Sequence, residues 1–410
     1  MSGYGASPWP AEDGGPARLQ AVPETLALGL QPGERLRCIS RPTLLSTMTV
    51  LGAPGEVFVL THSALRARIG LPTTACVERI DPVTLAPQRR SPRLAGGPMW
   101  PGGMALAAHG DLLVVYGRYA HRLDRDCQVQ ASHRLAVDEA YNSFVLLDNG
   151  LLVCKNLSRH TPARLSVLDP WTLEEVDAIE APGPSVARLS AQGLTVYVLG
   201  LSCIWRYHWD EGQGRLRRDE DWQVDYGQER SHAWDGVLAG DTLWFMDNGE
   251  HRYLTTMRAA GVHPGDNRLQ GASLRDGHLH TRVSVCGLPH GSITNPPLVD
   301  PRRRIVVAFD SAHDWLRAWR ITPDGLQDLW QHHPFGCASH MLLYPASGEL
   351  VLNDHRRTGE QVVVLDMESG QEKGRVRVGG WTQGVVFPAP GWQRDFYWSS
   401  MSRLARIFVD

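Results

Sequence analysis

One hairpin phrase occurs eight times along the 410 residues of this chain. In every copy an apolar run meets a tight turn, and a second run rich in β-branched or aromatic residues follows at once. The turns fall near positions 55, 110, 150, 193, 240, 302, 348 and 391. The copies are VLGAPGEVFVL from Val50, LAAHGDLLVVY from Leu106, VLLDNGLLVCK from Val145, LSAQGLTVYVL from Leu189, VLAGDTLWFM from Val237, LVDPRRRIVVAF from Leu298, LLYPASGELVL from Leu342 and VVFPAPGWQRDFYW from Val385.

The spacing of these hairpins decides the fold class. Successive turns lie 40 to 62 residues apart, and hairpins at such a period are typical of four-stranded propeller blades. No segment keeps apolar residues at helical spacing for three turns, which argues against helical repeats and a doubly wound α/β fold. A β-sandwich would lack a constant long period. The sequence predicts an all-β propeller of eight blades, or of seven if the long unit Ser231–Gly287 contains an inserted hairpin.

The last repeat is incomplete, and this predicts how the ring closes. After FYWSSMS only RLARIFVD remains, which supplies a third strand but no fourth. Gly33–Ser40 is the one β-like stretch before the first copy, so we expect it to pair with the C-terminal strand and remove an open sheet edge. Residues 1–22, rich in Gly, Pro and Ser, are expected to form a disordered leader, and residues 23–410 a single propeller domain.

Composition narrows the partners and the cellular compartment. A formal net charge of −3 gives no basic footprint for nucleic acid or for an anionic membrane. The sequence holds no apolar run long enough for a transmembrane helix, and its start has no signal-peptide pattern. Seven scattered cysteines without a C-x-x-C pair indicate buried thiols in a reducing compartment, not a disulfide framework or a zinc site. We therefore expect a cytoplasmic protein.

Polar residues flank the inner strands, and this pattern predicts a site in the central channel. Innermost strands begin, and second strands end, on one face of a propeller, so the residues at these positions converge around the channel. Unpartnered polar groups are costly to bury, and such a histidine-rich ring therefore favours a ligand pocket. The predicted catalytic residues are His232, His340, Asp247 and Asp310. The predicted substrate-binding residues are Tyr141, Asn142, Lys155, Trp234, Asn295, Asn353, His355 and Gln383.

Two chemistries suit this ring of imidazoles, amides and carboxylates. The pocket holds one divalent metal (Ca, Zn or Fe), or it works without metal through an acid–base pair of His232 and His340. In the second case Asp247 or Asp310 would orient one imidazole and raise its basicity. No histidine spacing selects between the two forms, and no nucleotide cofactor is indicated.

The blade pattern resembles the broad β-propeller superfold. Asn142, Asn295, Asp247 and Asp310 match in residue type the polar rings of calcium-centred lactonases and gluconolactonase-like hydrolases. An eight-bladed ring is also similar to the quinoprotein alcohol dehydrogenases, whose blade motif ends in a glycine and a docking tryptophan. The segment VLDMESGQEKGRVRV, which begins at Val364, has no tryptophan at the corresponding place. PQQ is therefore not expected. No repeat carries the paired G-H and W-D of WD-repeat scaffolds.

The sequence thus predicts a small-molecule enzyme with its active site in the central channel. The expected chemistry is that of a metal-assisted, lactonase-like hydrolase or an acid–base lyase or isomerase, because no nucleophile elbow or Cys–His pairing is present. The alternative is a non-catalytic scaffold whose rim binds a protein partner. A closed polar pocket would indicate the enzyme, and an exposed apolar rim the scaffold.

Overall fold

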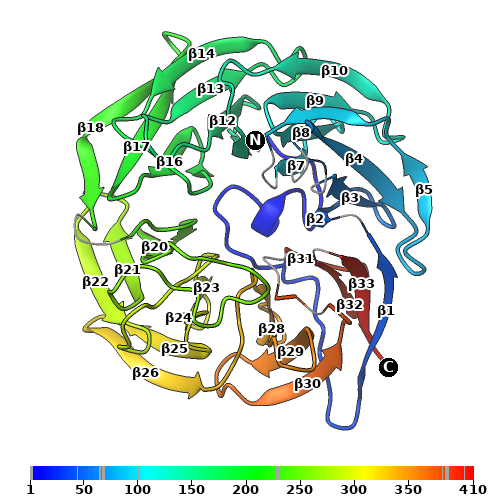
Figure 1. The fold of residues 1–410 in the computed structure, drawn as a ribbon, viewed down its shortest axis with the longest axis vertical. Helices are drawn as coiled ribbons and strands as arrows, with labels where there is room; N and C mark the ends of the chain where they lie inside the picture. The colour runs from blue at the N-terminus through cyan, green and yellow to red at the C-terminus, as the bar shows by residue number, and fades with distance from the viewer. Residues whose placement is uncertain are drawn as a thin grey trace.

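The eight repeated hairpins form the inner strands of eight blades arranged in a ring, as Figure 1 shows for the computed structural model. This confirms the predicted eight-bladed propeller. The structure describes residues 3–43, 45–63, 66, 70–98, 102–227, 231–380, 382–383, 387–400 and 402–410; the side chains of residues 46, 47 and 142 are also outside this description. We call the face where the innermost strands begin the top face, and the face with the hairpin turns the bottom face.

Each blade is one antiparallel sheet. The blades are numbered in the chain order of their innermost strands, and the strands of each blade are given starting with the innermost. Blade 1 contains β2 (Ser46–Leu51), β3 (Val57–His62), β4 (Thr73–Ile80), β5 (Pro87–Arg90) and β6 (Leu94–Gly97), and blade 2 contains β7 (Gly103–Leu106), β8 (Leu112–Tyr116), β9 (Tyr119–Leu123) and β10 (Val129–Arg134). Blade 3 contains β11 (Tyr141–Leu146), β12 (Leu152–Asn156), β13 (Arg164–Leu168) and β14 (Glu175–Glu180), and blade 4 contains β15 (Ser190–Gln192), β16 (Thr195–Leu199), β17 (Cys203–Asp210) and β18 (Arg215–Asp225). Blade 5 contains β19 (Val237–Ala239), β20 (Thr242–Met246), β21 (Arg268–Ser273) and β22 (Leu279–Ser284), and blade 6 contains β23 (Leu298–Asp300), β24 (Ile305–Asp310), β25 (Trp315–Thr322) and β26 (Gly325–His332). Blade 7 contains β27 (Leu342–Tyr344), β28 (Glu349–Asn353), β29 (Gln361–Asp366) and β30 (Glu372–Arg377), and blade 8 contains β31 (Pro388–Pro390), β32 (Asp395–Ser399), β33 (Arg403–Val409) and β1 (Leu36–Pro42).

The N-terminal strand closes the ring. β1 pairs antiparallel with β33, with Leu36 opposite Val409 and Pro42 opposite Arg403. The pairing completes the four-stranded sheet of blade 8 and covers the edge that the short last repeat leaves open. The strand begins three residues later than the stretch Gly33–Ser40 that the sequence indicates, and it extends two residues further.

Local sequence patterns explain the burial of the blade strands and the turns between them. The second strands β3 and β24 are buried along their whole length, whereas the outer strand β5 is exposed at every residue, as expected for sheets that pack face to face. Asp81 shows how the outer hairpins turn: its Oδ1 accepts the backbone N–H groups of Val83 and Thr84 at 3.0 and 2.7 Å. Asx turns of this kind fix the hairpin without tertiary contacts.

An insertion in blade 5 covers part of the top face. The connection between β20 and β21 spans residues 247–267 and lies within the long unit in which the sequence predicted an insertion. Gln383, in front of β31, holds this loop: its Oε1 accepts the backbone N–H of Met257 at 2.7 Å and the hydroxyl of Thr256 at 2.9 Å. The blade 5 loop therefore reaches across to blade 8 and forms a cover, which we call the lid loop.

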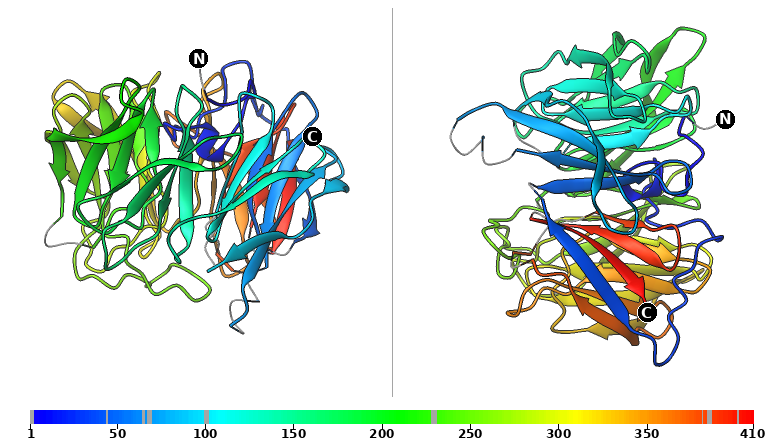
Figure 2. Two further views of the ribbon diagram at one scale, coloured as in Figure 1. Left: turned by 90° about the horizontal axis from the view of Figure 1, so that it is seen from above. Right: turned by 90° about the vertical axis from the view of Figure 1, so that its right-hand side faces the viewer.

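The N-terminal segment enters the ring, in contrast to the disordered leader expected for residues 1–22. Its described part, from residue 3, runs through the centre in Figure 1 and enters from the side shown at the top of the left view in Figure 2. The backbone of Trp9 accepts a hydrogen bond from Leu51, that of Pro16 from Ala191 and that of Gln20 from Leu343. The inner strands thus supply the backbone partners that a Gly- and Pro-rich segment cannot supply for itself.

Two further features concern the cysteines and the expected absence of a transmembrane helix. All seven cysteines are free thiols. Within the described ranges, no helix has the length and apolar character needed to cross a bilayer.

Candidate functional site

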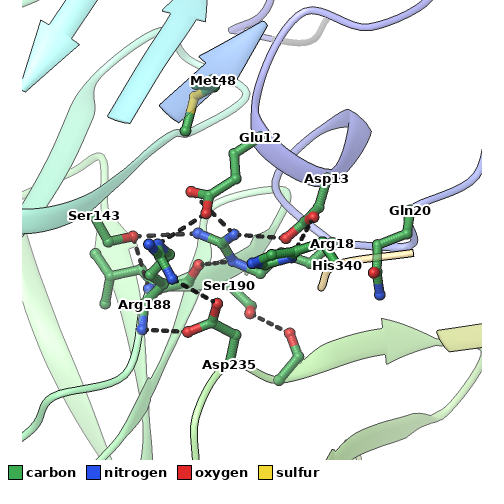
Figure 3. A network of polar contacts seen from close by, with 12 residues as sticks. Glu12, Asp13, Arg18, Gln20, Met48, Ser143, Arg188, Ser190, Asp235 and His340 are labelled. Atoms are coloured by element: carbon green, nitrogen blue, oxygen red, sulfur yellow. Dashed lines mark hydrogen bonds and ion pairs between the residues drawn. The ribbon is translucent and has the colours of Figure 1, made fainter. Parts of the chain in front are cut away.

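The centre of the ring is filled by the protein's own N-terminal segment. The short helix η1 (Glu12–Gly14) lies in the channel, where Figure 3 shows its two carboxylates among side chains from the surrounding blades. Glu12, Asp13 and Arg18 are 8%, 4% and 2% exposed, values that are rare for charged residues. The cavity that remains beside the segment has a volume of only about 10 Å³. The channel is therefore a packed core at this level.

An ion network joins the N-terminal segment to the blades (Figure 3). Arg18 Nη1 lies 3.2 Å from Glu12 and 3.0 Å from Asp13. Arg188, in front of β15, lies 2.8 Å from Glu12 and 3.3 Å from Asp235. A buried ion pair gains little unless further hydrogen bonds complete it, and here Arg18 Nε also donates to the carbonyl of Leu189 at 2.7 Å.

His340 belongs to the same cluster. Its Nδ1 lies 2.8 Å from Asp13 Oδ1, although the contact lacks the geometry of a hydrogen bond. The imidazole stacks on Phe387 with ring centroids 4.1 Å apart, and the guanidinium of Arg188 lies 4.9 Å from the centre of that same ring. The aromatic ring of Phe387 thus connects blade 4 to blade 7 across the channel.

The carboxylates of this cluster face three basic groups. Glu12, Asp13 and Asp235 lie beside Arg18, Arg188 and the imidazole of His340. Burial raises the pKa of Glu12, against the opposing effects of Arg18 and Arg188. For Asp235 burial also raises the pKa, but Arg188 and Arg18 outweigh it and the pKa falls.

The two predicted catalytic aspartates accept hydrogen bonds from neighbouring segments of their own blades. Asp247 accepts the backbone N–H of Arg268 at 3.0 Å and the amide of Gln270 at 2.8 Å. Asp310 Oδ1 accepts the backbone N–H groups of Ser292 and Ala312 at 3.1 and 3.0 Å. Both are fully buried at the end of a second strand. Their register is the one predicted, but the carboxylate that contacts His340 is Asp13 and not Asp247 or Asp310.

His232 and His340 have separate surroundings. His232 is 7% exposed and meets Trp234 edge to face with ring centroids 5.2 Å apart. Burial, together with the charges of Arg159 and His251, lowers the pKa of His232 to about 3. An imidazole with such a pKa is a poor proton acceptor at neutral pH, so His232 does not suit the general-base role predicted for it.

Several predicted substrate-binding residues hold loops together. Asn295 Nδ2 donates to the carbonyl of Ala338 at 2.6 Å, while Asn353 Oδ1 accepts the backbone N–H of the same residue at 3.0 Å. These two asparagines therefore meet around one residue of blade 7. Gln383 holds the lid loop and donates to the carbonyl of Gly336 at 3.0 Å. Trp234 Nε1 donates to the carbonyl of Gly249 at the same distance.

The remaining predicted residues do not surround a common cavity. Lys155 is fully buried, and its Nζ donates to the carbonyls of Asn156 and Ser185 at 3.1 Å each. Burial lowers the pKa of Lys155 to about 7 and raises that of Tyr141 to about 12. His355 is 8% exposed beneath the top face. The side chain of Asn142 lies outside the described part of the structure.

The residues that sequence reasoning missed come mainly from the N-terminal segment. Glu12, Asp13 and Arg18 sit in a stretch whose composition indicates disorder, and no periodic signal marks them. Asp235 and Arg188 lie close to inner strands, in front of β19 and β15. The acidic pair followed by an arginine is a weak signal that could have suggested a buried ion network.

Larger cavities open at the top-face rim and not in the channel. One, of about 300 Å³, is lined by Arg258, Pro334, Gly336, Asp354, Arg356, Arg357 and Thr358; we call it the arginine pocket. Another, of about 150 Å³, is lined in part by His62, Cys76, Arg90 and Arg93. These two pockets lie at the ends of blades 7 and 1.

Comparisons with known proteins show the fold. No family model and no curated protein sequence matches this chain. The quinohaemoprotein alcohol dehydrogenase of Comamonas testosteroni is 10% identical over 98% of this chain and 80% of its own length, with a TM-score of 0.64. A europium-containing methanol dehydrogenase is 11% identical over 97% and 90%, with a TM-score of 0.65. The Dos1 propeller is 8% identical over 92% and 95%, with a TM-score of 0.57.

These findings correct the predicted function. The neighbours with enzyme names are dehydrogenases, so the expected hydrolase, lyase or isomerase chemistry is wrong. The physical reason lies in the channel, where Glu12, Arg18 and Arg188 occupy the volume of the predicted pocket. The neighbours include enzymes and a propeller named without an activity.

The cofactor expectation is corrected too. Quinohaemoprotein dehydrogenases share this fold, so the missing tryptophan in the blade motif does not exclude a quinone, and the prediction against PQQ is wrong. Identities of 8 to 11% carry no cofactor over to this chain.

Proposed function

We propose that this protein binds a small anionic molecule in the arginine pocket at the rim of its top face. The observation that carries the proposal is a cavity of about 300 Å³ with three guanidinium groups and one carboxylate in its lining. This volume lies at the lower end of the range of small-molecule sites. Guanidinium groups bind carboxylates and phosphates through paired, charge-assisted hydrogen bonds.

The charges of the pocket do not cancel. Asp354, the carboxylate of the lining, already pairs with Arg356 at 2.7 Å and with Arg375 at 2.6 Å. Burial raises its pKa, but Arg375 and Arg356 outweigh this and lower it, so Asp354 stays ionised and is fully compensated. Arg357 is exposed and has no carboxylate partner among the described residues. Its positive charge is therefore available to a ligand.

The pocket is held in shape by contacts beneath it. Asp354 Oδ1 accepts the backbone N–H of Gly336 at 2.9 Å, which joins the two sides of the cavity. A side chain could not replace Gly336 without a clash, because a Cβ there would lie 2.3 Å from the carbonyl oxygen of His355. From the lid loop, Arg258 reaches Asp314 of blade 6. A preformed pocket of this kind loses less conformational entropy when a ligand binds.

The test is a titration of the full-length protein with anions of different size. Inorganic phosphate, citrate and adenosine monophosphate are compared with glycerol by isothermal titration calorimetry, in wild type and Arg357→Gln. Arg275→Gln is the matched control, because Arg275 is 90% exposed on the outer turn between β21 and β22. We expect at least one anion to bind, at least tenfold more weakly to Arg357→Gln, and unchanged to Arg275→Gln.

Two results would contradict the proposal. One is the absence of binding by all three anions at low ionic strength, where exposed charges are least screened. The other is equal affinity of wild type and Arg357→Gln. Recovery and analysis of the bound anion after incubation distinguishes simple binding from turnover.

A further inference from the structure

Three metal-ligating side chains from separate segments meet at the top-face side of blade 6, away from the channel. Cys286 follows β22, Asp310 ends β24 and His313 lies in the turn before β25. Asp310 Oδ2 lies 3.3 Å from Cys286 Sγ and 3.1 Å from His313 Nδ1. All three candidate ligand atoms lie within 4.8 Å of one another.

These distances suit a small tetrahedral ion. Zinc lies roughly 2.0 to 2.3 Å from oxygen, nitrogen and sulfur ligands, which places neighbouring ligand atoms of a tetrahedron roughly 3.3 to 3.6 Å apart. The observed separations of 3.1 and 3.3 Å need to open by only a few tenths of an ångström. A thiolate, an imidazole and a carboxylate together favour zinc or cobalt over calcium or magnesium.

The surroundings hold the ligands in orientation. Asp310 Oδ1 is bound to two backbone N–H groups, those of Ser292 and Ala312, so Oδ2 faces the other two side chains. The backbone of Pro289 also contributes to the raised pKa of His313. Asp310 is fully buried, whereas the side chain of His313 is 23% exposed and Cys286 is half-buried. An ion can therefore reach the site from solvent.

Protons occupy the ligand atoms when no ion is bound. Burial and then the charge of Asp310 raise the pKa of Cys286 to about 12, so the group is a neutral thiol. The hydrogen bond to Asp310 raises the pKa of His313. A divalent ion would displace one proton from the thiol and, at low pH, one from the imidazolium, which makes its affinity rise with pH.

The channel cluster differs from this site in its charge balance. Glu12, Asp13, Asp235 and His340 also bring their ligand atoms within 4.8 Å of one another. Two buried arginines, Arg18 and Arg188, already pair with those carboxylates. Asp310 Oδ2, by contrast, lies beside a thiol and an imidazole, both of which are metal ligands in their deprotonated forms.

We propose that Cys286, Asp310 and His313 bind one divalent transition-metal ion of the zinc class, with water completing its coordination. The site is independent of the arginine pocket and of any ligand bound there. It uses one residue from the end of blade 5 and two from blade 6, so an ion there would also link the two blades.

Cobalt provides a direct test, because a thiolate bound to Co²⁺ gives a charge-transfer absorption in the near ultraviolet. Full-length protein, treated with EDTA and then freed of it, is titrated with Co²⁺ under reducing conditions. We expect a band that saturates at one equivalent and is displaced by Zn²⁺. Cys286→Ser should abolish the band, and His313→Ala should weaken Co²⁺ binding at least tenfold. Cys203→Ser, at another half-buried cysteine, and Arg357→Gln should bind as wild type does.

A measurement on the wild type keeps the test independent of how the variants fold. Zn²⁺ should protect Cys286 from iodoacetamide, as measured by peptide mass spectrometry, and should leave the alkylation of Cys203 unchanged. Absence of a cobalt band, a band retained in Cys286→Ser, or unchanged alkylation of Cys286 with Zn²⁺ would each overturn the proposal. Asp310 is left intact because its replacement would also remove two backbone hydrogen bonds.

Discussion

Arg18→Met tests whether the N-terminal segment is an integral part of the propeller core. Arg18 is 2% exposed and contacts Glu12 at 3.2 Å, Asp13 at 3.0 Å and the carbonyl of Leu189 at 2.7 Å. Methionine keeps much of the length and volume of the side chain but removes its charge and its donors. The change therefore isolates the electrostatic role of Arg18 from its packing.

The expected magnitude follows from burial. Breaking a buried ion pair by removing one partner costs about 3 to 5 kcal/mol, because the other charge stays buried and uncompensated. With about 2.1 cal/mol/K of unfolding entropy per residue, a 410-residue chain unfolds with about 0.9 kcal/mol/K. A loss of about 4 kcal/mol thus lowers the melting temperature by about 5 °C.

Differential scanning calorimetry measures this shift, and Arg37→Met is the matched control. Arg37 also lies in the N-terminal region and pairs with Asp410 at 2.8 Å, but its side chain is 60% exposed. Exposed pairs contribute about 0 to 1 kcal/mol, so the control should melt within about 1 °C of wild type. If Arg18→Met also melts within about 1 °C of wild type, residues 3–22 do not form the buried network and the disordered leader expected from composition is correct.

Three further predictions concern buried groups of the top face. Burial lowers the pKa of His62 to about 4 from 6.5. Unfolding therefore takes up a proton, and the free energy of unfolding falls by about 2 kcal/mol as the pH drops from 7 to 5. His62→Gln should lose less stability over this range, and a melting temperature with the same pH dependence as wild type would contradict the assignment. Burial raises the pKa of Glu360 to about 8 from 4.5. The free energy of unfolding therefore falls by about 3 kcal/mol as the pH rises from 5 to 8. Glu360→Gln should flatten that pH dependence, and a change of stability with pH equal to that of wild type would refute the buried, protonated carboxyl group. Gln383→Ala removes the hydrogen-bond acceptor for Met257 and Thr256. Backbone amide hydrogen exchange of residues 253–260 should then accelerate at least tenfold, while that of β24 stays unchanged. Unaltered exchange of residues 253–260 would show that Gln383 does not hold the lid loop.

The fold could be predicted because its signal is local and repeated. Each hairpin turn combines Gly, Pro, Asp or Asn with flanking apolar runs. Eight such signals favoured eight blades over the alternative of seven, and the structure has eight. Asp81 shows the mechanism, since its side chain closes the turn with neighbouring residues alone. Ring closure by the N-terminal strand also follows from the sequence, because the last repeat has one strand too few and β1 supplies it.

The candidate site could be predicted only in part. Register arguments placed Asp247 and Asp310 correctly at the ends of second strands, but did not identify their partners. Asp247 accepts hydrogen bonds from Arg268 and Gln270 of β21, and Asp310 accepts them from backbone N–H groups of Ser292 and Ala312. His340 lies in the channel as expected, yet its carboxylate neighbour is Asp13, about 330 residues away in the chain. No repeat-based reasoning could have found a contact with a segment outside the repeat.

The sequence by itself predicts the blades and the strand that closes the ring, because turn chemistry and the alternation of apolar residues act over a few neighbouring positions; the structure decides for eight blades and against seven. Only the tertiary structure decides what fills the channel and where the cavities lie. Glu12, Asp13 and Arg18 have the composition of a solvated segment, and they are buried because the inner strands of several blades present backbone partners and basic side chains at one place. That convergence of distant residues fills the expected channel pocket with core, whereas a larger cavity lies at the rim.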